Sequence, residues 1–250
     1  MTDVPKMGYW KIRGLAQPIR LIFEYAGATY DDNQFTAPEE WFPTKFDHGF
    51  DFPNLPYLID GDVKLTQSNA IMRHLARKYK LAPKTEADER NCDVMAGIFA
   101  DLKSSFSKMC YNATLNSMKS GHSRSLFIDH SLPPFPLPTN GSIVSSVGDD
   151  GYEKLKVDFM KNLPTTLKQI SKFLGSKKWM IGDNILYVDF LMYELLECLK
   201  RFDASVFDDL KNLKDYMTRF EALPNIAKFM SSNRFIGYPI NGPMATWGGK

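Results

Sequence analysis

The stretch that decides the fold is Asp51-Phe-Pro-Asn-Leu-Pro-Tyr-Leu-Ile-Asp-Gly-Asp-Val-Lys-Leu-Thr-Gln-Ser-Asn-Ala-Ile-Met-Arg73. Within it, Tyr57–Asp60 and Val63–Thr66 are two short runs with the composition of strands. They are separated by Gly61-Asp62, and two residues of this type between two such runs are typical of a tight β-turn. The stretch therefore predicts a β-hairpin that is followed directly by a helix.

Two further features of the same stretch indicate a ligand. Proline lowers the cost of a cis peptide bond to about 0.5–1 kcal/mol, so the Leu55-Pro56 bond is a candidate. A cis bond there would turn the backbone of Leu55 outward, where it could pair with an extended peptide. Gln67 and Ser68 begin a helix, whose free N–H groups favour a carboxylate. The stretch thus predicts a peptide-binding edge beside an anion site.

The residues before this stretch predict a strand, a helix and a second strand. Such a unit implies a parallel pair of strands with a right-handed crossover. Pro5 limits the first strand to a late start. Together with the hairpin and its helix, the unit predicts a small α/β domain over residues 1–82, in the order βαβ then ββα. The expected elements are Val4–Trp10, Ala16–Ala26, Thr29–Phe35, a short helix over Trp41–Asp47, and a last helix over Ser68–Tyr79.

A polar segment that contains proline, Leu81–Asp88, marks the expected domain boundary. Beyond it the apolar residues recur at helical spacing, so we expect an all-α domain over residues 90–230 and a tail over residues 231–250. The helices expected in this domain are Glu89–Tyr111, Glu153–Leu174, Asp189–Phe202, Asp208–Ala222 and Ile226–Ser231.

Residues 113–152 interrupt the helical pattern and are rich in Ser, Gly and Pro. A structureless loop of this length is unusual inside a compact domain. The first of three interpretations is a misjoined stretch of coding sequence. The second is a genuine flexible loop, since doubling a loop costs only about 0.6 kcal/mol. The third is a docking segment, because Pro133–Pro136 has the PxxP spacing.

The composition excludes several classes of protein. With 44% hydrophobic and 24% charged residues the chain is typical of globular proteins, and a net charge of +2 is too small to favour nucleic acid or a membrane as partner. The N-terminus lacks the apolar core of a signal peptide, and Cys92, Cys110 and Cys198 are scattered and odd in number. We therefore expect a cytoplasmic location. The four histidines have no metal-ligand spacing, so we expect no metal.

The segment Gly8–Gly14 lies where the first strand passes into the first helix, and such strand ends gather functional sites. No cysteine lies nearby, which excludes a dithiol mechanism there. A hydrogen bond from the hydroxyl of Tyr9 to a bound thiol would favour the thiolate. Lowering a thiol pKa of about 8.5 by two units, worth roughly 2.7 kcal/mol, would leave it mostly ionised at neutral pH. The alternative is that Tyr9 is only a half-buried aromatic at a strand end.

Gly8-Tyr-Trp-Lys-Ile-Arg-Gly-Leu-Ala-Gln-Pro-Ile-Arg20, taken with residues 51–73, resembles the cytosolic glutathione S-transferases, and among them the mu class. The resemblance implies a thioredoxin-like domain followed by an all-helical domain, a homodimer, and addition of the glutathione thiolate to hydrophobic electrophiles in detoxification. It covers nearly the whole chain apart from the segment after Asn112. The further matching segments are Met109–Asn112, Glu153–Lys156, Val188–Leu191 and Met244–Lys250.

The resemblance also implies roles for individual residues. Tyr9 is the implied catalytic residue, which stabilises the thiolate. Tyr111, Met109 and the tail are implied for the electrophile, and Phe52 and Arg73 for the dimer interface. The implied glutathione-binding residues are Trp10, Trp41 and Lys45 for its glycine end, Asn54 and Leu55 (beside a cis Pro56) for its cysteinyl backbone, Gln67 and Ser68 for its γ-glutamyl group, and Asp101 for the glutathione of the neighbouring subunit.

The chain departs from the family pattern at two places besides residues 113–152, and the insertion and the shorter segment before Trp41 leave a non-catalytic function open. The segment between Phe35 and Trp41 is shorter than in the mu class. In addition, Leu186 stands where many members carry the Ser or Thr of a capping box with Asp189, which predicts a loss of about 0.5–2 kcal/mol. The alternatives are a non-catalytic binder of hydrophobic ligands and a sigma-type glutathione-dependent isomerase. The mu-like tail and Tyr111 argue against the isomerase.

Overall fold

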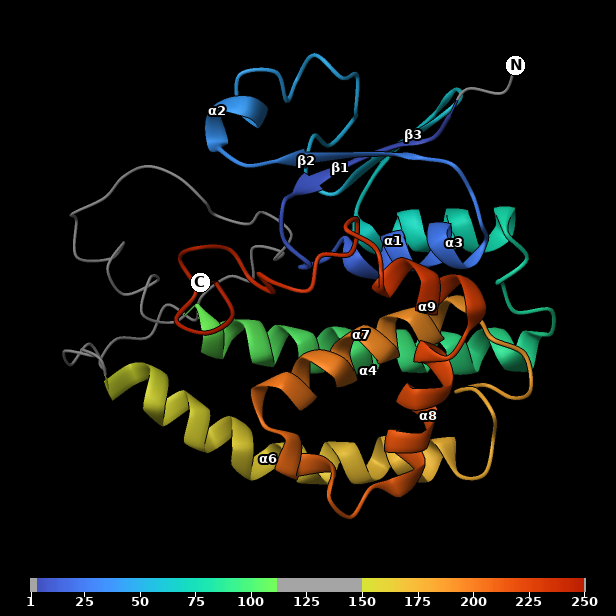
Figure 1. Cartoon of the computed structure of the whole chain (residues 1–250), viewed down its shortest axis with the longest axis vertical. Helices are drawn as coiled ribbons and strands as arrows, with labels where there is room; N and C mark the ends of the chain where they lie inside the picture. Colours follow the sequence, from blue (N-terminus) through green and yellow to red (C-terminus); the bar gives the residue numbers. More distant parts are fainter. Residues whose placement is uncertain (1–3, 112–149, 250) are drawn as a thin grey trace, which may run out of the picture.

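The computed structural model describes residues 4–111 and 150–249. A sheet lies at one side of the molecule, and helices α1 (Gln17–Tyr25) and α3 (Ser68–Lys78) lie between it and the helices that follow α3 in the sequence (Figure 1). The contacts of α1 and of α3 with α7 (Tyr187–Phe202) join the two parts of the chain. The predicted fold class, a thioredoxin-like α/β part followed by an all-helical part, is confirmed.

The sheet has four strands in the order β2-β1-β3-β4. β1 (Lys6–Trp10) is parallel to β2 (Asp31–Phe35), whereas β3 (Tyr57–Asp60) is antiparallel to both β1 and β4 (Val63–Thr66). The hairpin therefore has the predicted bounds, and its turn uses Gly61 at a φ of 60°, which glycine adopts without strain. The prediction of the βαβ-ββα order is confirmed.

One glycine in β1 makes room for an aromatic side chain. A Cβ atom on Gly8 would lie 2.2 Å from the ring of Tyr57 on the neighbouring strand. Tyr57 is only 4% exposed and could not yield this space easily. Glycine at position 8 thus allows Tyr57 to pack across β1, next to the residue from which the candidate site is built.

The helix predicted over residues 41–47 is wrong. The structure has a helix, α2, at Pro38–Trp41, and Phe42–His48 form turns. Pro38 at the first helical turn has the φ that a helix start requires. The carboxylate of Glu40 accepts hydrogen bonds of 2.7 Å from both the N–H and the hydroxyl of Thr36, which fixes the helix start before Trp41.

The helical part contains six described elements. α7 is buried along most of its length and starts at Tyr187 rather than at Asp189. The helix predicted to begin at Glu153 begins at Asp150 in the structure. The other residues of the 113–152 segment lie outside the described part of the chain, so the three interpretations concern residues that the structure does not describe. The elements are α4 (Glu86–Cys110), α6 (Asp150–Leu174), α7, the 3-10 helix η1 (Ala204–Phe207), α8 (Lys211–Glu221) and α9 (Pro224–Met230).

Contacts between α1 and the helical part are both apolar and polar. The rings of Tyr25 and Phe190 meet edge to face with their centroids 5.4 Å apart. Asn225 donates a hydrogen bond of 3.0 Å to the carbonyl of Tyr25, and Arg234 forms an ion pair with Glu24. The described helices include none with the length and apolar character needed to cross a bilayer.

Candidate active site

Tyr9 lies in β1 with 5% of its surface exposed. Its hydroxyl oxygen accepts a hydrogen bond of 3.3 Å from the N–H of Leu15. Gly14, at a φ of 45°, allows this approach, because a Cβ atom there would lie 2.6 Å from the same oxygen. A donor to the phenol oxygen strengthens the hydrogen bond that the phenol itself can donate. The segment after β1 therefore prepares Tyr9 to act as a hydrogen-bond donor.

The C-terminal tail holds this segment in place. The N–H groups of Arg13 and Gly14 donate to the carbonyls of Pro239 and Ile240 at 2.9 and 3.0 Å. A few residues further on, the N–H of Gly242 donates to the hydroxyl of Tyr111 at 2.6 Å. Figure 1 shows the tail, in red, beside the C-terminal end of α4. The tail thus links the Tyr9 segment to Tyr111.

An aromatic cluster surrounds the candidate tryptophans. Trp41 is 3% exposed and stacks on Tyr57 and His48, with centroids 5.8 and 5.4 Å away. Trp10 lies against Phe35 at 6.1 Å. Lys45 is half-buried in the turns after α2, with its Nζ 5.0 Å from the ring centre of Phe46. These contacts fix both indoles at one end of the sheet.

The backbone before β3 has the predicted cis bond. The Leu55-Pro56 peptide is cis, and Leu55 is 5% exposed. The N–H of Leu55 donates to Oδ1 of Asn54 at 2.9 Å. A peptide ligand that pairs with this N–H must therefore displace the side chain of Asn54, so the two residues act together.

Gln67 and Ser68 begin α3 in an unusual conformation. Gln67 has a φ of 70° and a ψ of 110°. A residue other than glycine in such a region costs about 1–3 kcal/mol, and strain of this kind gathers at functional sites. Gln67 is exposed and Ser68 is half-buried as the first residue of the helix. The strained start of α3 supports a ligand role for both residues.

The remaining candidates lie on helices or on an exposed turn. Asp101 and Met109 both line a pocket of about 360 Å³ between α4 and α6. Tyr111 instead contacts the tail, where its hydroxyl accepts a hydrogen bond from Gly242. Phe52 is 77% exposed. Arg73 forms an ion pair with Asp93, and its guanidinium lies 5.4 Å from the ring centre of Tyr187. Their roles remain predictions.

Comparison with known proteins decides the family. Residues 5–77 match the family model described as glutathione S-transferase, N-terminal domain, and residues 142–233 match the one described as glutathione S-transferase, C-terminal domain. The chain belongs to the glutathione S-transferase family. The predicted use of glutathione as co-substrate is therefore confirmed.

Individual relatives place the transferase near the mu class. It is 38% identical to glutathione S-transferase Mu 2 of Homo sapiens and to Mu 1 of Mus musculus, over 98% of each chain. The crystal structure of the glutathione S-transferase Blo t 8 covers 97% of this chain and 99% of its own, at 27% identity and a TM-score of 0.78. The Pi-class enzyme of Onchocerca volvulus covers 98% and 100%, at 26% identity and a TM-score of 0.75. These likenesses confirm the predicted mu-like transferase and favour neither alternative function.

A buried ionic cluster of the transferase was missed by sequence reasoning. Arg13, from the segment after Tyr9, is 1% exposed and meets Glu194 and Glu197 of α7. Its Nε and Nη2 donate to Glu194 at 3.0 and 2.6 Å, and Nη2 lies 2.6 Å from Glu197. Burial is the largest single effect and lowers the pKa of the Arg13 guanidinium, but Glu194, Cys198 and Glu197 together outweigh it and raise the pKa above its usual value.

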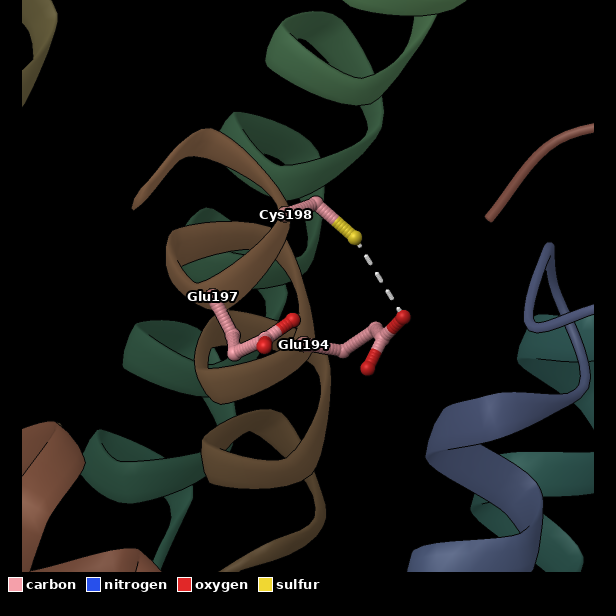
Figure 2. A group of neighbouring side chains, drawn as sticks. All are labelled: Glu194, Glu197 and Cys198. Atoms are coloured by element: carbon pink, nitrogen blue, oxygen red, sulfur yellow. Dashed lines mark hydrogen bonds between the residues drawn. The ribbon is translucent and has the colours of Figure 1, made fainter. Parts of the chain in front are cut away.

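Cys198 completes this cluster. Figure 2 shows Glu194, Glu197 and Cys198 on α7, where the thiol of Cys198 donates to Glu194 at 3.4 Å. The three offer ligand atoms within 4.8 Å of one another, as a metal site would. Both carboxylates, however, already meet the guanidinium of Arg13, and burial raises the pKa of the Cys198 thiol, so it stays protonated. We therefore assign the cluster to ion pairing between the two parts of the chain.

Proposed function

We propose that this transferase conjugates glutathione to small hydrophobic electrophiles, and that Tyr9 is its catalytic residue. The observation that carries the proposal is the surroundings of the Tyr9 hydroxyl. It is buried beside the end of β1, it accepts a hydrogen bond from Leu15, and the segment between them is held by the tail. A positioned phenol of this kind is suited to hold a sulfur atom as the thiolate.

In the proposed reaction, Tyr9 donates a hydrogen bond to the sulfur of bound glutathione and lowers the pKa of the thiol, whose proton passes to water. The thiolate then attacks the electrophilic carbon and forms a carbon–sulfur bond, while the leaving group departs with the electron pair of the bond that breaks. Only the thiolate is a good nucleophile, so the stabilised fraction determines the rate near neutral pH.

The two carboxylates and the amine of glutathione need partners of opposite charge. Lys45 lies in the turns shortly after Trp41 and offers a cation for the glycine carboxylate. The strained start of α3 at Gln67 and Ser68 offers N–H groups for the γ-glutamyl carboxylate. We assign Asn54 and Leu55 to the cysteinyl backbone, and Asp101 to the amine of a glutathione held by a second subunit.

The electrophile would lie near Tyr111, Met109 and the tail. The bond from Gly242 to the Tyr111 hydroxyl supports a role for Tyr111, because it places this phenol on the tail segment that also holds Arg13 and Gly14. Met109 lines the α4–α6 pocket, so its contribution would be apolar contact from that side.

We also propose a homodimer that works in the cytoplasm in detoxification. An aromatic side chain that is 77% exposed, such as Phe52, favours burial against a second subunit. Arg73 is held by Asp93 and Tyr187 and would present a fixed cation at that contact. Replacing Phe52 with Ser should shift the protein towards monomer in sedimentation at micromolar concentration. A dimer of unchanged affinity would contradict the role of Phe52.

The mechanism is tested by Tyr9→Phe, assayed with 1-chloro-2,4-dinitrobenzene. Loss of one positioned donor to a developing or existing anion typically costs about 10²–10³-fold in rate. We expect that loss in kcat/KM, a thiol pKa of bound glutathione raised towards its free value, and little change in glutathione affinity. Tyr25→Phe is the matched control, since it removes a phenol at the α1–α7 contact. Full activity in Tyr9→Phe would exclude the mechanism.

A further inference from the structure

His48 is a titratable residue that the proposed reaction does not use. It lies at the end of the turns that follow α2, and its ring packs among aromatic side chains. α2 ends at Trp41 and the turns carry Lys45, so His48 shares a short segment with two residues assigned to the glycine end of glutathione. Figure 1 shows this segment on the side of the sheet away from the helical part, so its position depends on local contacts.

The imidazole of His48 supports Trp41 from one side. The two rings are nearly parallel, with an interplanar angle of 16° and their centroids 5.4 Å apart. The rings of Tyr57 and Phe50 lie 5.4 and 5.9 Å from the imidazole. Trp41, Phe50 and Tyr57 are buried, whereas His48 is half-buried. The imidazole therefore closes this aromatic cluster towards solvent.

The backbone of His48 is held independently of its ring. Nζ of Lys64, on β4, donates a hydrogen bond of 2.9 Å to the carbonyl of His48. Gly49, at a φ of 72°, allows this approach, because a Cβ atom there would lie 2.9 Å from the same nitrogen. A substitution that changes only the ring at position 48 should therefore leave the path of the chain in place.

One nitrogen of the imidazole is buried without a partner. Nε2 of His48 has no hydrogen-bond partner among the described residues. A neutral imidazole can leave one nitrogen as a bare acceptor, whereas in the cation both nitrogens are donors. Protonation would thus place a charged N–H in an apolar cluster without an acceptor, and burial of an unpaired charge is costly. For this N–H to reach an acceptor or water, the ring would have to move away from Trp41.

The groups around the imidazole do not remove this conflict. Aromatic faces attract a cation from above the ring plane, but the N–H lies in the plane of the imidazole and stays unpaired. Lys64 brings a second positive charge to the same turn. In the described part of the chain, no neighbouring charged or titratable side chain forms a hydrogen bond with the imidazole. These neighbours are Tyr57 of β3, Lys64 of β4, and Lys45, Asp47 and Asp51 of the turns.

We propose that His48, as a neutral ring, is a positioning residue of the glutathione site, and that a proton on its imidazole weakens binding of the glycine end. The inference rests on the proposed function, which assigns Trp41 and Lys45 to that end. The stacked ring keeps the indole, and the turn that carries Lys45, in the arrangement that fits the ligand. The protonated ring leaves the cluster, and Trp41 then lacks the side chain that supports it.

The test measures binding of S-methylglutathione to the full chain by calorimetry, because this ligand has no thiol that titrates. Between about pH 7.5 and about pH 5.5, the range in which histidine side chains change charge, we expect its dissociation constant to rise. A rise of about fivefold corresponds to the loss of one aromatic pair. His48→Phe keeps a ring on Trp41 but cannot take up a proton, so it should bind like the parent at the higher pH and show no rise. Equal pH dependence in the parent and His48→Phe would overturn the proposal.

Two comparisons locate the effect. γ-Glutamyl-S-methylcysteine lacks the glycine, so its dissociation constant should change little over the same pH range. His74→Gln is the matched control, because His74 lies on α3, where it pairs with Asp60, and this variant should keep the pH dependence of the parent. Loss of the pH dependence in His74→Gln, or an equal rise for both ligands, would overturn the proposal.

The direction of the effect distinguishes positioning from direct attraction of charge. A cationic His48 that acted on the glycine carboxylate itself would strengthen binding as the pH falls, and that result would overturn the proposal. Failure of the proposed function has a different signature. Absence of S-methylglutathione binding would overturn both, whereas binding that does not depend on pH in the parent, with activity lost in Tyr9→Phe, would overturn only the role of His48.

Discussion

Helix α7 buries carboxylates in two places, and their partners differ in kind. At its N-terminal end, Asp189 accepts hydrogen bonds from neutral groups, the N–H of Met180 and of Leu186 at 2.8 Å and the hydroxyl of Tyr216 at 3.1 Å. Further along the helix, Glu194 is paired with the guanidinium of Arg13.

The difference shows two ways to keep an acid inside a protein. Around Asp189 the donors stabilise the carboxylate but bring no opposite charge, and burial raises its pKa to about 6 although those hydrogen bonds lower it. Around Glu194 the charge itself is balanced. The stability contributed by Asp189 therefore depends on pH, whereas the stability contributed by Glu194 depends on the presence of Arg13.

The largest effect is expected from Arg13→Met, which breaks the second arrangement. Glu194 is 2% exposed and would stay buried without a cation. Breaking a buried pair in this way costs about 3–5 kcal/mol, to be measured as the free energy of unfolding in urea. Arg90→Met breaks only an exposed pair and should cost less than about 1 kcal/mol. Equal losses in the two variants would refute the contrast.

A smaller effect is expected when pH is used to probe the first arrangement. The folded pKa of Asp189 lies above its ordinary value of 3.8, so the native protein binds this proton more tightly than the unfolded chain. Its contribution to stability is present below about pH 4 and is lost as the pH rises through about 6, by about 3 kcal/mol. The free energy of unfolding of the parent minus that of Asp189→Asn should therefore fall by this amount as the pH is raised through that range. A flat difference would show that Asp189 does not titrate there.

The smallest effect concerns the missing half of the capping box. The N–H of Leu186 already donates to Asp189, and what is missing is a side-chain acceptor at position 186. Leu186→Thr should supply it and raise the thermal midpoint, by less than the full value of a cap, because Leu186 is 8% exposed and packs in the core. Leu186→Val has the shape of the Thr variant without its hydroxyl. The free energy of unfolding of Leu186→Thr should therefore exceed that of Leu186→Val by about 1 kcal/mol. A midpoint at or below that of the parent would contradict this prediction.

Local chemistry explains what could be predicted from the sequence. The hairpin of β3 and β4 was predicted at its observed bounds because the turn at Gly61 and Asp62 lies between two runs of strand composition. The helix predicted at residues 41–47 was wrong because Pro38 and the hydrogen bonds between Thr36 and Glu40 start the helix earlier.

The ionic cluster could not be predicted by the same means. Arg13 and Glu194 lie 181 residues apart, and a buried arginine has the same sequence signature as an exposed one. In the candidate site, strand ends, turns and the family resemblance predicted Tyr9, Leu55 and Gln67. None of these signals predicted that the tail supports the Tyr9 segment, because backbone hydrogen bonds between distant segments leave no residue pattern.

That support has a consequence for how the enzyme is made. The strand that carries Tyr9 leaves the ribosome before the helical part and the tail, and domains nearer the N-terminus generally fold first during synthesis. The carbonyls of Pro239 and Ile240 that fix the neighbouring segment, and the N–H of Gly242 that holds Tyr111, are translated long after that strand. A nascent chain can thus have a folded sheet for most of its synthesis and still lack a finished site, so activity begins only when translation has passed Gly242.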